Sequence, residues 1–198
     1  MHKKTPHTFP KFELSLPCWV SGHIPDPEHV YETIEERMEL VIKLAEMNIK
    51  HGGGPFGAGV FDMKTGTLLA PGINLVLSSQ CSLAHAETVA IALAQQVSQT
   101  HDLGEHGTRL TQLVTSAEPC AMCFGAIPWS GIASLVYGAE SRDVCKLGFD
   151  EGPKPENWIT ELEARNIQVT GRIRQKKAIE ILHQYTLAGG QIYNGQPG

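Results

Sequence analysis

The sequence lacks long hydrophobic runs and an excess of positive charge. It contains no stretch of about 18 or more consecutive apolar residues, which a membrane-spanning helix requires. Residues 1–10 also lack the apolar core of a secretion signal, so we expect a cytoplasmic protein. Its 16 basic side chains are outnumbered by 21 acidic ones, which gives a formal charge of −5. That balance argues against a polyanionic partner such as tRNA or DNA.

Cysteine is also sparse, and it does not occur in an even number. The cysteines are scattered along the chain, at Cys18, Cys81, Cys120, Cys123 and Cys145. A disulfide framework uses cysteines in pairs and is typical of small secreted domains, so this pattern does not favour one. We interpret some of these thiols as metal ligands or catalytic groups.

The length and composition predict one folded domain with flanking segments. With 198 residues and 41% hydrophobic side chains, the chain is large enough for a single substantial core. Residues 1–27 contain several prolines and show no sustained periodicity, which predicts an extended arm on the surface. We assign the folded domain to 28–188 and a C-terminal tail to 189–198.

Hydrophobic periodicity predicts alternating helices and strands in the domain. Apolar residues at helical spacing predict a first helix that is capped by Asp26 and ends at His51. The first two strands should form a hairpin, with a bulge or break at Pro71-Gly72. A later strand, helix and strand form a βαβ unit, whose strands should be parallel. The predicted strands are 56–63, 67–77, 110–115, 132–138 and 167–170, and the later helices are 82–96, 120–129, 141–147 and 172–188.

The segment GGGPFG at 52–57 matches the G-x-G-x-x-G pattern of dinucleotide-binding loops. In such loops the pattern follows a strand and opens a helix, whereas here it follows a helix and leads into a strand. We therefore interpret it as a helix-to-strand turn in which glycine permits unusual backbone angles.

A cluster of metal-binding residue types is the strongest chemical signal in the sequence. Cys120 and Cys123 follow a proline at the start of a predicted helix, where the helix dipole stabilises thiolates. With His85 as a third ligand, the fourth tetrahedral position stays open, as in a catalytic zinc site. A closed structural zinc site would need a fourth protein ligand, and neither Cys81 nor Cys145 is an obvious one.

Glu87 lies two residues after His85, close enough to reach the open position without occupying it. Zinc lowers the pKa of a bound water from 15.7 to about 7, and a carboxylate there could take the proton of the water. The H-x-E and P-C-x-x-C motifs together are the signature of zinc-dependent nucleobase deaminases. A non-catalytic zinc-binding protein on the same fold is the alternative, and it predicts that Glu87 is dispensable.

The segments HAE at 85–87 and PCAMCFGAI at 119–127 resemble the cytidine deaminase superfamily, and the resemblance extends from about residue 30 to the C-terminus. It implies an α/β fold, namely a three-layer α/β/α sandwich with a mixed five-stranded sheet. It also implies one Zn²⁺ per chain with a water or hydroxide as the fourth ligand.

Two branches of this superfamily share the motif PCxMCxGAI, namely tRNA adenosine deaminases and guanine deaminases. Trp129 after the second motif, and GFDEG at 148–152 with an acid at position 151, resemble the guanine deaminases. The resemblance thus implies hydrolysis of guanine to xanthine and ammonia, with aminotriazines as further candidate substrates. A tRNA adenosine deaminase and a guanosine or cytidine deaminase stay open as alternatives. The basic segment RIRQKK at 172–177 is more typical of a solvated helix face than of an RNA-binding stripe.

The resemblance also implies roles in binding a purine base. Phe56 would stack on the purine, Asn74 would hydrogen-bond its polar edge, and the backbone of Ala86 would meet the base beside the metal. Trp129 would close the pocket. Without the resemblance, Phe56 and Trp129 could equally be core aromatics, and Asn74 could be a turn residue.

A second acid is expected because the amine of guanine is on C2. Water attack at that carbon requires protons at a ring nitrogen and at the departing amine, on different sides of the same atom. Glu87 could serve the water and the ring nitrogen while Glu151 serves the amine. Many superfamily members carry Asp at this position, so neighbouring Asp150 is a rival, and a solvated loop acid is the alternative.

Guanine deaminases of this superfamily are homodimers in which the C-terminal segment crosses to the partner and covers its active site. The resemblance therefore implies a homodimer, in which the tail 189–198 could be swapped. Tyr193 is the candidate lid residue, and Gly189-Gly190 would be the hinge. A frayed terminus is the alternative.

Overall fold

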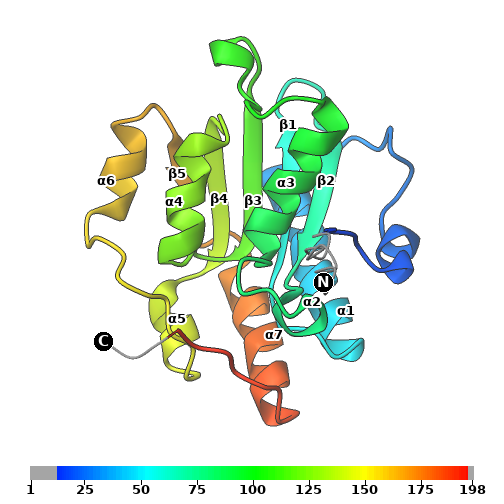
Figure 1. The fold of residues 1–198 in the computed structure, drawn as a ribbon, viewed down its shortest axis with the longest axis vertical. Helices are drawn as coiled ribbons and strands as arrows, with labels where there is room; N and C mark the ends of the chain where they lie inside the picture. The colour runs from blue at the N-terminus through cyan, green and yellow to red at the C-terminus, as the bar shows by residue number, and fades with distance from the viewer. Residues whose placement is uncertain (1–12, 196–198) are drawn as a thin grey trace, which may run out of the picture.

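The computed structural model describes residues 13–195 as an α/β fold built on one five-stranded sheet (Figure 1). β1 pairs antiparallel with both β2 and β3, whereas the pairs β3–β4 and β4–β5 are parallel. The predicted hairpin, parallel βαβ unit and mixed sheet are thus confirmed. The strands are β1 (Gly57–Asp62), β2 (Leu68–Ile73), β3 (Thr111–Ala117), β4 (Ser134–Ala139) and β5 (Gln168–Thr170), in the spatial order β2-β1-β3-β4-β5.

Helices cover both faces of the sheet, as Figure 1 shows. One face carries α1 (Ile34–Lys50), α5 (Ser141–Cys145) and α7 (Gln175–Leu187), and the other carries α3 (Ala86–Ser98), α4 (Ala121–Trp129) and α6 (Trp158–Glu163). Successive residues of a strand point to opposite faces of the sheet, so Val114 packs in the core under α1 and α7, whereas Leu113 packs in the core under α3 and α4. The three-layer α/β/α sandwich is therefore confirmed. Within residues 13–195, every helix is too short or too polar to cross a membrane.

The first long helix begins later than predicted. Thr33, not Asp26, is the N-cap of α1: its hydroxyl accepts from the backbone N–H of Glu36 at 3.2 Å, and the Glu36 carboxylate accepts from the N–H of Thr33 at 3.4 Å. This reciprocal pair is a capping box. Upstream, the N–H of Tyr31 donates to the carbonyl of Gly66 at 2.9 Å, so this segment is held against the hairpin turn and is not helical.

Part of the predicted extended arm is folded. Residues Cys18–His23 form a 3₁₀ helix with Val20 buried, and the ring of Trp19 stacks on that of His51 at 4.5 Å between centroids. This contact attaches the arm to the C-terminal end of α1. Residues 1–12 of the arm lie outside the described residues.

Strand β2 contains no bulge at Pro71 and Gly72, contrary to the prediction. Both residues stay in register with β1. The register shifts further along, where Val60 pairs with Ala70 and Phe61 with Leu68, so the extra residue of β2 is Leu69. β2 is an edge strand, where proline is tolerated because its missing N–H can face away from the sheet. Gly72 is required by a close approach, because a Cβ there would lie 2.1 Å from the carbonyl oxygen of Ala86. β2 and the start of α3 are thus in backbone contact.

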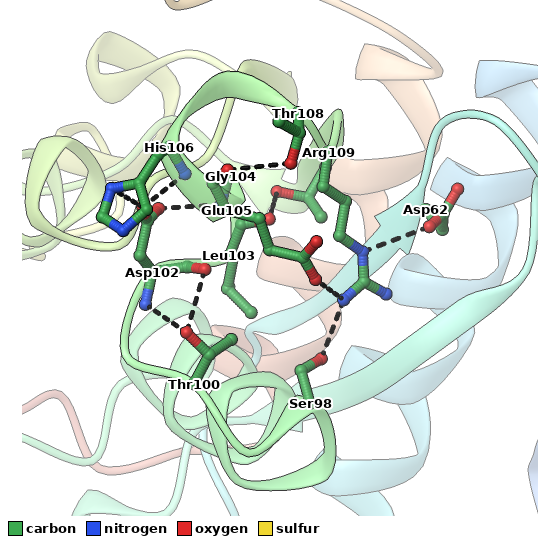
Figure 2. Close-up of polar contacts among 11 residues, drawn as sticks. Asp62, Ser98, Thr100, Asp102, Leu103, Gly104, Glu105, His106, Thr108 and Arg109 are labelled. Atoms are coloured by element: carbon green, nitrogen blue, oxygen red, sulfur yellow. Dashed lines mark hydrogen bonds and ion pairs between the residues drawn. The ribbon is translucent and has the colours of Figure 1, made fainter.

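The polar loop 99–110 is fixed by its own hydrogen bonds, as Figure 2 shows. The carboxylate of Asp102 accepts two backbone N–H bonds within the loop, at 2.9 and 2.8 Å. Arg109 donates to the hydroxyl of Ser98 at 3.2 Å and to Asp62 at 3.3 Å. Because this loop precedes β3, it lies at the end of that strand opposite to the one that leads to Cys120.

Candidate metal centre

Three potential metal ligands converge where two helices begin. His85 is the N-cap of α3 and Cys120 is the N-cap of α4, with Cys123 inside the first turn of α4. Nδ1 of His85 lies 3.5 Å from Sγ of Cys120 and 3.7 Å from Sγ of Cys123, and the three ligand atoms lie within 4.8 Å of one another. One imidazole and two thiolates suit Zn²⁺ and leave one tetrahedral position free. The predicted ligand cluster therefore fits a single zinc site.

The pKa values of the two cysteine thiols are shifted in opposite directions. A hydrogen bond from the thiol of Cys123, assisted by His85, lowers the pKa of Cys120 to about 4. The same hydrogen bond, followed by burial, raises the pKa of Cys123 well above its usual value, so this thiol holds its proton more tightly. Because a divalent cation displaces thiol protons, zinc binding would release this proton and leave two thiolates.

Glu87 is a buried carboxyl in the first turn of α3. Only 7% of it is exposed, and it lines the same cavity as His85 and Cys120. Burial, followed by the negative charge of Cys120, raises the pKa of Glu87 to about 7. A group with such a pKa can both accept a proton and return it near neutral pH.

One cavity joins these groups to most of the residues that the sequence predicted for substrate binding. The predicted residues in its wall are Phe56, Asn74, His85, Glu87, Cys120, Glu151 and Tyr193, and Asp150, the rival of Glu151, also lines it. Ala86 and Cys123 are fully buried and do not form part of the wall. Distant parts of the chain thus meet at one place, namely the start of β1, the segment after β2, the starts of α3 and α4, the loop that carries Glu151 and the C-terminal tail.

Trp129 does not line this cavity. Its side chain is 88% exposed and lies in a different groove together with Leu110 and Phe124, so within one chain it does not close the pocket as predicted. The reason is the length of α4. Cys120 is at the first end of the helix and Trp129 at the last, and nine residues at 1.5 Å each separate the two ends by about 13 Å.

Asn74 is at once a turn residue and part of the cavity wall. Its Oδ1 accepts from the N–H of Val76 at 3.3 Å, and its carbonyl oxygen accepts from Nδ2 of Asn48 at 2.9 Å. Asn48 also donates to the carbonyl of Gly54 at 2.8 Å, so one buried amide joins two segments of the wall. Asn48 was not predicted as a site residue, because its only signal in the sequence is a polar residue on the apolar face of a helix.

Two aromatic residues of the wall were also missed. Phe149 meets Phe56 edge to face, with 5.2 Å between ring centroids, and stacks on Tyr185 at 6.2 Å. Phe149 and Tyr185 both line the cavity. Phe149 was within the quoted motif GFDEG but was not assigned a role, and Tyr185 was hidden in the periodic pattern of the last helix.

The two acids of that motif have different surroundings. Burial, followed by the negative charge of Cys120, raises the pKa of Glu151 to about 8, while Lys154 opposes the rise. Asp150 is exposed, and its Oδ1 accepts from the N–H of Gly152 at 2.8 Å. Asp150 therefore closes a turn, whereas Glu151 is the more enclosed carboxyl of the two.

The C-terminal tail is attached beside the cavity of its own chain. Asn194 accepts from the N–H of Asp150 at 2.8 Å and donates to the carbonyl of Gly148 at 2.9 Å. The hydroxyl of Tyr185 donates to the carbonyl of Gln191 at 2.5 Å. These bonds place Tyr193, which is 45% exposed, in the cavity wall.

Known proteins with this arrangement are similar over most of the chain. Residues 31–139 match the family described as the cytidine and deoxycytidylate deaminase zinc-binding region. A guanine deaminase of Bacillus subtilis is 38% identical over 118 residues, which is 59% of this chain and 71% of that protein. A solved guanine deaminase from Nitrosomonas europaea is 45% identical with a TM-score of 0.86, covering 92% of this chain and all of the other. A structure of a protein called NE0047 with 2,6-diaminopurine has 47% identity and the same TM-score of 0.86, over 92% and 96% of the two chains.

Proposed function

This chain belongs to the cytidine and deoxycytidylate deaminase zinc-binding family, and on that premise we propose that it hydrolyses guanine to xanthine and ammonia. The observation that carries the proposal is a second enclosed carboxyl, Glu151, in the cavity that holds Glu87 and the ligand cluster. Similarity to two guanine deaminases, one over 92% of this chain, supports the same substrate.

The chemistry divides between the metal and the two acids. A zinc ion held by His85, Cys120 and Cys123 would lower the pKa of a bound water to about 7. Glu87 then accepts a proton from the attacking water and passes it to a ring nitrogen of guanine. Glu151 delivers a proton to the amine on C2, and the C2–N bond breaks to release ammonia. The hydroxyl that C2 gained from the water then loses its remaining proton to Glu151, which forms xanthine and restores both acids to their starting states. Two acids with raised pKa values allow one to serve each side of the reacting carbon.

The remaining wall residues would hold the flat base. Phe56 and Phe149 offer aromatic surface, and the side chain of Asn74 offers an amide whose position is fixed by its own turn. We place Tyr193 at the mouth as the residue that covers the base, and the backbone of Ala86 beside the metal. The tail reaches this cavity in its own chain, so covering the base requires no exchange of tails between chains.

Ammonia release by the zinc-loaded protein tests the substrate. We expect release from guanine and not from guanosine, cytidine, adenine or an adenosine-containing tRNA hairpin. Glu151→Gln should lower kcat on guanine by about 10²-fold or more, because a positioned general acid contributes about 10²–10⁴-fold. Asp150→Asn should have a much smaller effect. Loss of activity in Asp150→Asn alone would instead make Asp150 the second acid, and a reaction with the tRNA hairpin but not guanine would refute the proposed substrate.

We propose further that the protein is a homodimer formed through the groove that contains Trp129. Leu110 and Trp129 are 55% and 88% exposed there and line one groove with Phe124, and an exposed apolar patch with a polar rim is typical of a protein–protein interface. Arg165 and Glu161 on the rim offer both signs of charge, which suits a self-complementary interface. Light scattering after size exclusion should give twice the mass of one chain, and Trp129→Glu should give a monomer. A wild-type monomer would contradict the proposal.

A further inference from the structure

We infer that Ser141 and Lys154 are positioning residues that hold the carboxyl group of Glu151 in place beside the start of α4. The inference rests on the proposed function, because it assigns to these residues a role in presenting the second acid to the substrate. Neither residue lines the cavity, so both would act through Glu151 and not on the base.

Lys154 is a buried cation whose donors are all used. Its Nζ donates to Oε1 of Glu118 at 2.5 Å, to the carbonyl of Pro119 at 2.8 Å and to Oγ of Ser141 at 2.9 Å. Only 8% of its side chain is exposed, against 10% for Glu118. The ammonium group also lies 4.7 Å from the centre of the Trp158 ring, within the range of a cation–π contact. A lysine with three hydrogen bonds and an aromatic neighbour has one defined position.

Ser141 connects this cation to the second acid. Its Oγ lies 2.7 Å from Oε1 of Glu118 and 3.4 Å from Oε2 of Glu151, and its backbone N–H donates to Oε2 of Glu118 at 3.1 Å. A serine hydroxyl has one proton and two lone pairs. Because Lys154 fills one lone pair, the Ser141 hydroxyl can accept a hydrogen bond from a neutral Glu151 while it donates to Glu118, or it can donate its own hydrogen bond to an ionised Glu151. The same hydroxyl thus has a hydrogen bond for either form of the acid.

The hydrogen-bond network of Glu118, Ser141 and Lys154 comes from several chain segments and connects Glu151 to the start of α4. Glu118 leads from β3 into α4, Ser141 begins α5 after β4, and Lys154 follows in the next loop. The carbonyl of Glu151 also accepts from the N–H of Ala121 at 2.8 Å, which fixes its backbone to the first residue of α4. Backbone and side chain of Glu151 are therefore held against the same structure that carries Cys120 and Cys123.

The competing explanation is that Lys154 and Glu118 form an ion pair with a purely structural role. Variants of Ser141 distinguish this explanation from a positioning role. Ser141→Ala removes the only side-chain hydrogen bond of Glu151 within residues 13–195, yet keeps the Lys154–Glu118 pair. Ser98→Ala is the control for removal of a hydroxyl far from the cavity, because Ser98 at the end of α3 accepts one hydrogen bond from Arg109, beyond the opposite end of β3 (Figure 2). Ser141→Thr is the conservative variant that retains the hydroxyl.

Steady-state kinetics on guanine with the zinc-loaded chain provide the test. Ser141→Ala should lower kcat by about tenfold, the effect of losing one hydrogen bond in the transition state, with KM changed less than about twofold. Zinc content and melting temperature should match those of Ser98→Ala, and Ser141→Thr should recover most of kcat. An unchanged kcat in Ser141→Ala, or a loss that follows zinc content or melting temperature, would overturn the inference.

The lysine is tested in a double variant that leaves no unpaired buried carboxylate. Lys154→Met combined with Glu118→Gln should bind zinc and fold, and should have a lower kcat than Glu118→Gln alone, which is the reference because Glu118 itself lines the cavity. A kcat equal to that of Glu118→Gln alone would show that Lys154 does not help to position Glu151.

Failure of the substrate assignment can be told apart from failure of this inference. A wild-type chain that releases no ammonia from guanine would refute the proposed function. Crystal structures of zinc-loaded wild type and Ser141→Ala would still decide the positioning role, because we expect the Glu151 carboxyl to shift or to occupy several conformers only in the variant. An unmoved, fully ordered carboxyl in Ser141→Ala would refute it.

Discussion

Glu87→Gln is expected to lower kcat for guanine by about 10³-fold while zinc content and fold stay intact. Glutamine has nearly the same shape but cannot accept a proton, and proton transfer by a positioned group accounts for about 10²–10⁴-fold in rate. The effect should fall in the upper part of that range because Glu87 serves both the water and the ring nitrogen. Its burial, with 7% exposed, leaves little room for bulk water to replace it.

The measurement is kcat by ammonia release, with zinc content determined on the same samples. Glu180→Gln is the matched control, because Glu180 is an exposed glutamate on α7. If Glu87→Gln kept more than about a tenth of the wild-type kcat, proton transfer by this residue would be refuted. The chain would then fit the alternative of a zinc protein in which Glu87 is dispensable.

Cys123→Ser is expected to abolish stoichiometric zinc binding and with it the activity. Cys123 is fully buried, and its Sγ lies 3.7 Å from Nδ1 of His85 within the ligand cluster, so its sulfur is placed to bind zinc as a second thiolate. A serine hydroxyl is a far poorer ligand, because it does not ionise near neutral pH and lacks the soft character of sulfur. Only two protein ligands would remain.

Elemental analysis after dialysis should give one zinc per wild-type chain and much less than one for Cys123→Ser. Cys145→Ser, which changes an exposed cysteine, is the control and should keep its zinc. Zinc should also raise the melting temperature of the wild type, since a ligand present at 100 times its Kd stabilises the folded state by about 2.7 kcal/mol. Full zinc occupancy in Cys123→Ser would show that the ligand set is wrong.

The ligand cluster and Glu87 could be predicted because short-range chain geometry decides their relative positions. His85 and Glu87 are in one helical turn, as are Cys120 and Cys123, so their spacing in sequence fixes which side chains can meet. The strands and the βαβ unit were equally readable, because buried strands produce continuous apolar runs. The first helix was misplaced because Asp26-Pro27 and Thr33-x-x-Glu36 are both valid starts, and only the contact of Tyr31 with the hairpin selects the second.

Features that depend on long-range packing could not be predicted in the same way. Nothing local places Phe149 against Phe56, or Asn48 between Gly54 and Asn74, because these contacts join segments that are distant in sequence. In the sequence Lys154 is one of several polar loop residues, and only the fold shows that it pairs with Glu118. Trp129 was misplaced for the opposite reason: its motif suggested the cavity, but the length of α4 carries it to the far end of the helix.

The attachment of the tail by Asn194 has a consequence for inhibitors. A compound that fills the cavity and contacts Tyr193 would have to leave past the tail. Two hydrogen bonds of Asn194 hold this tail to Asp150 and Gly148. Breaking those bonds would then be part of dissociation, so long residence times can be obtained without faster association. Chemical series against this cavity should therefore be ranked by dissociation rate, and contact with the Tyr193 ring is the first interaction to optimise.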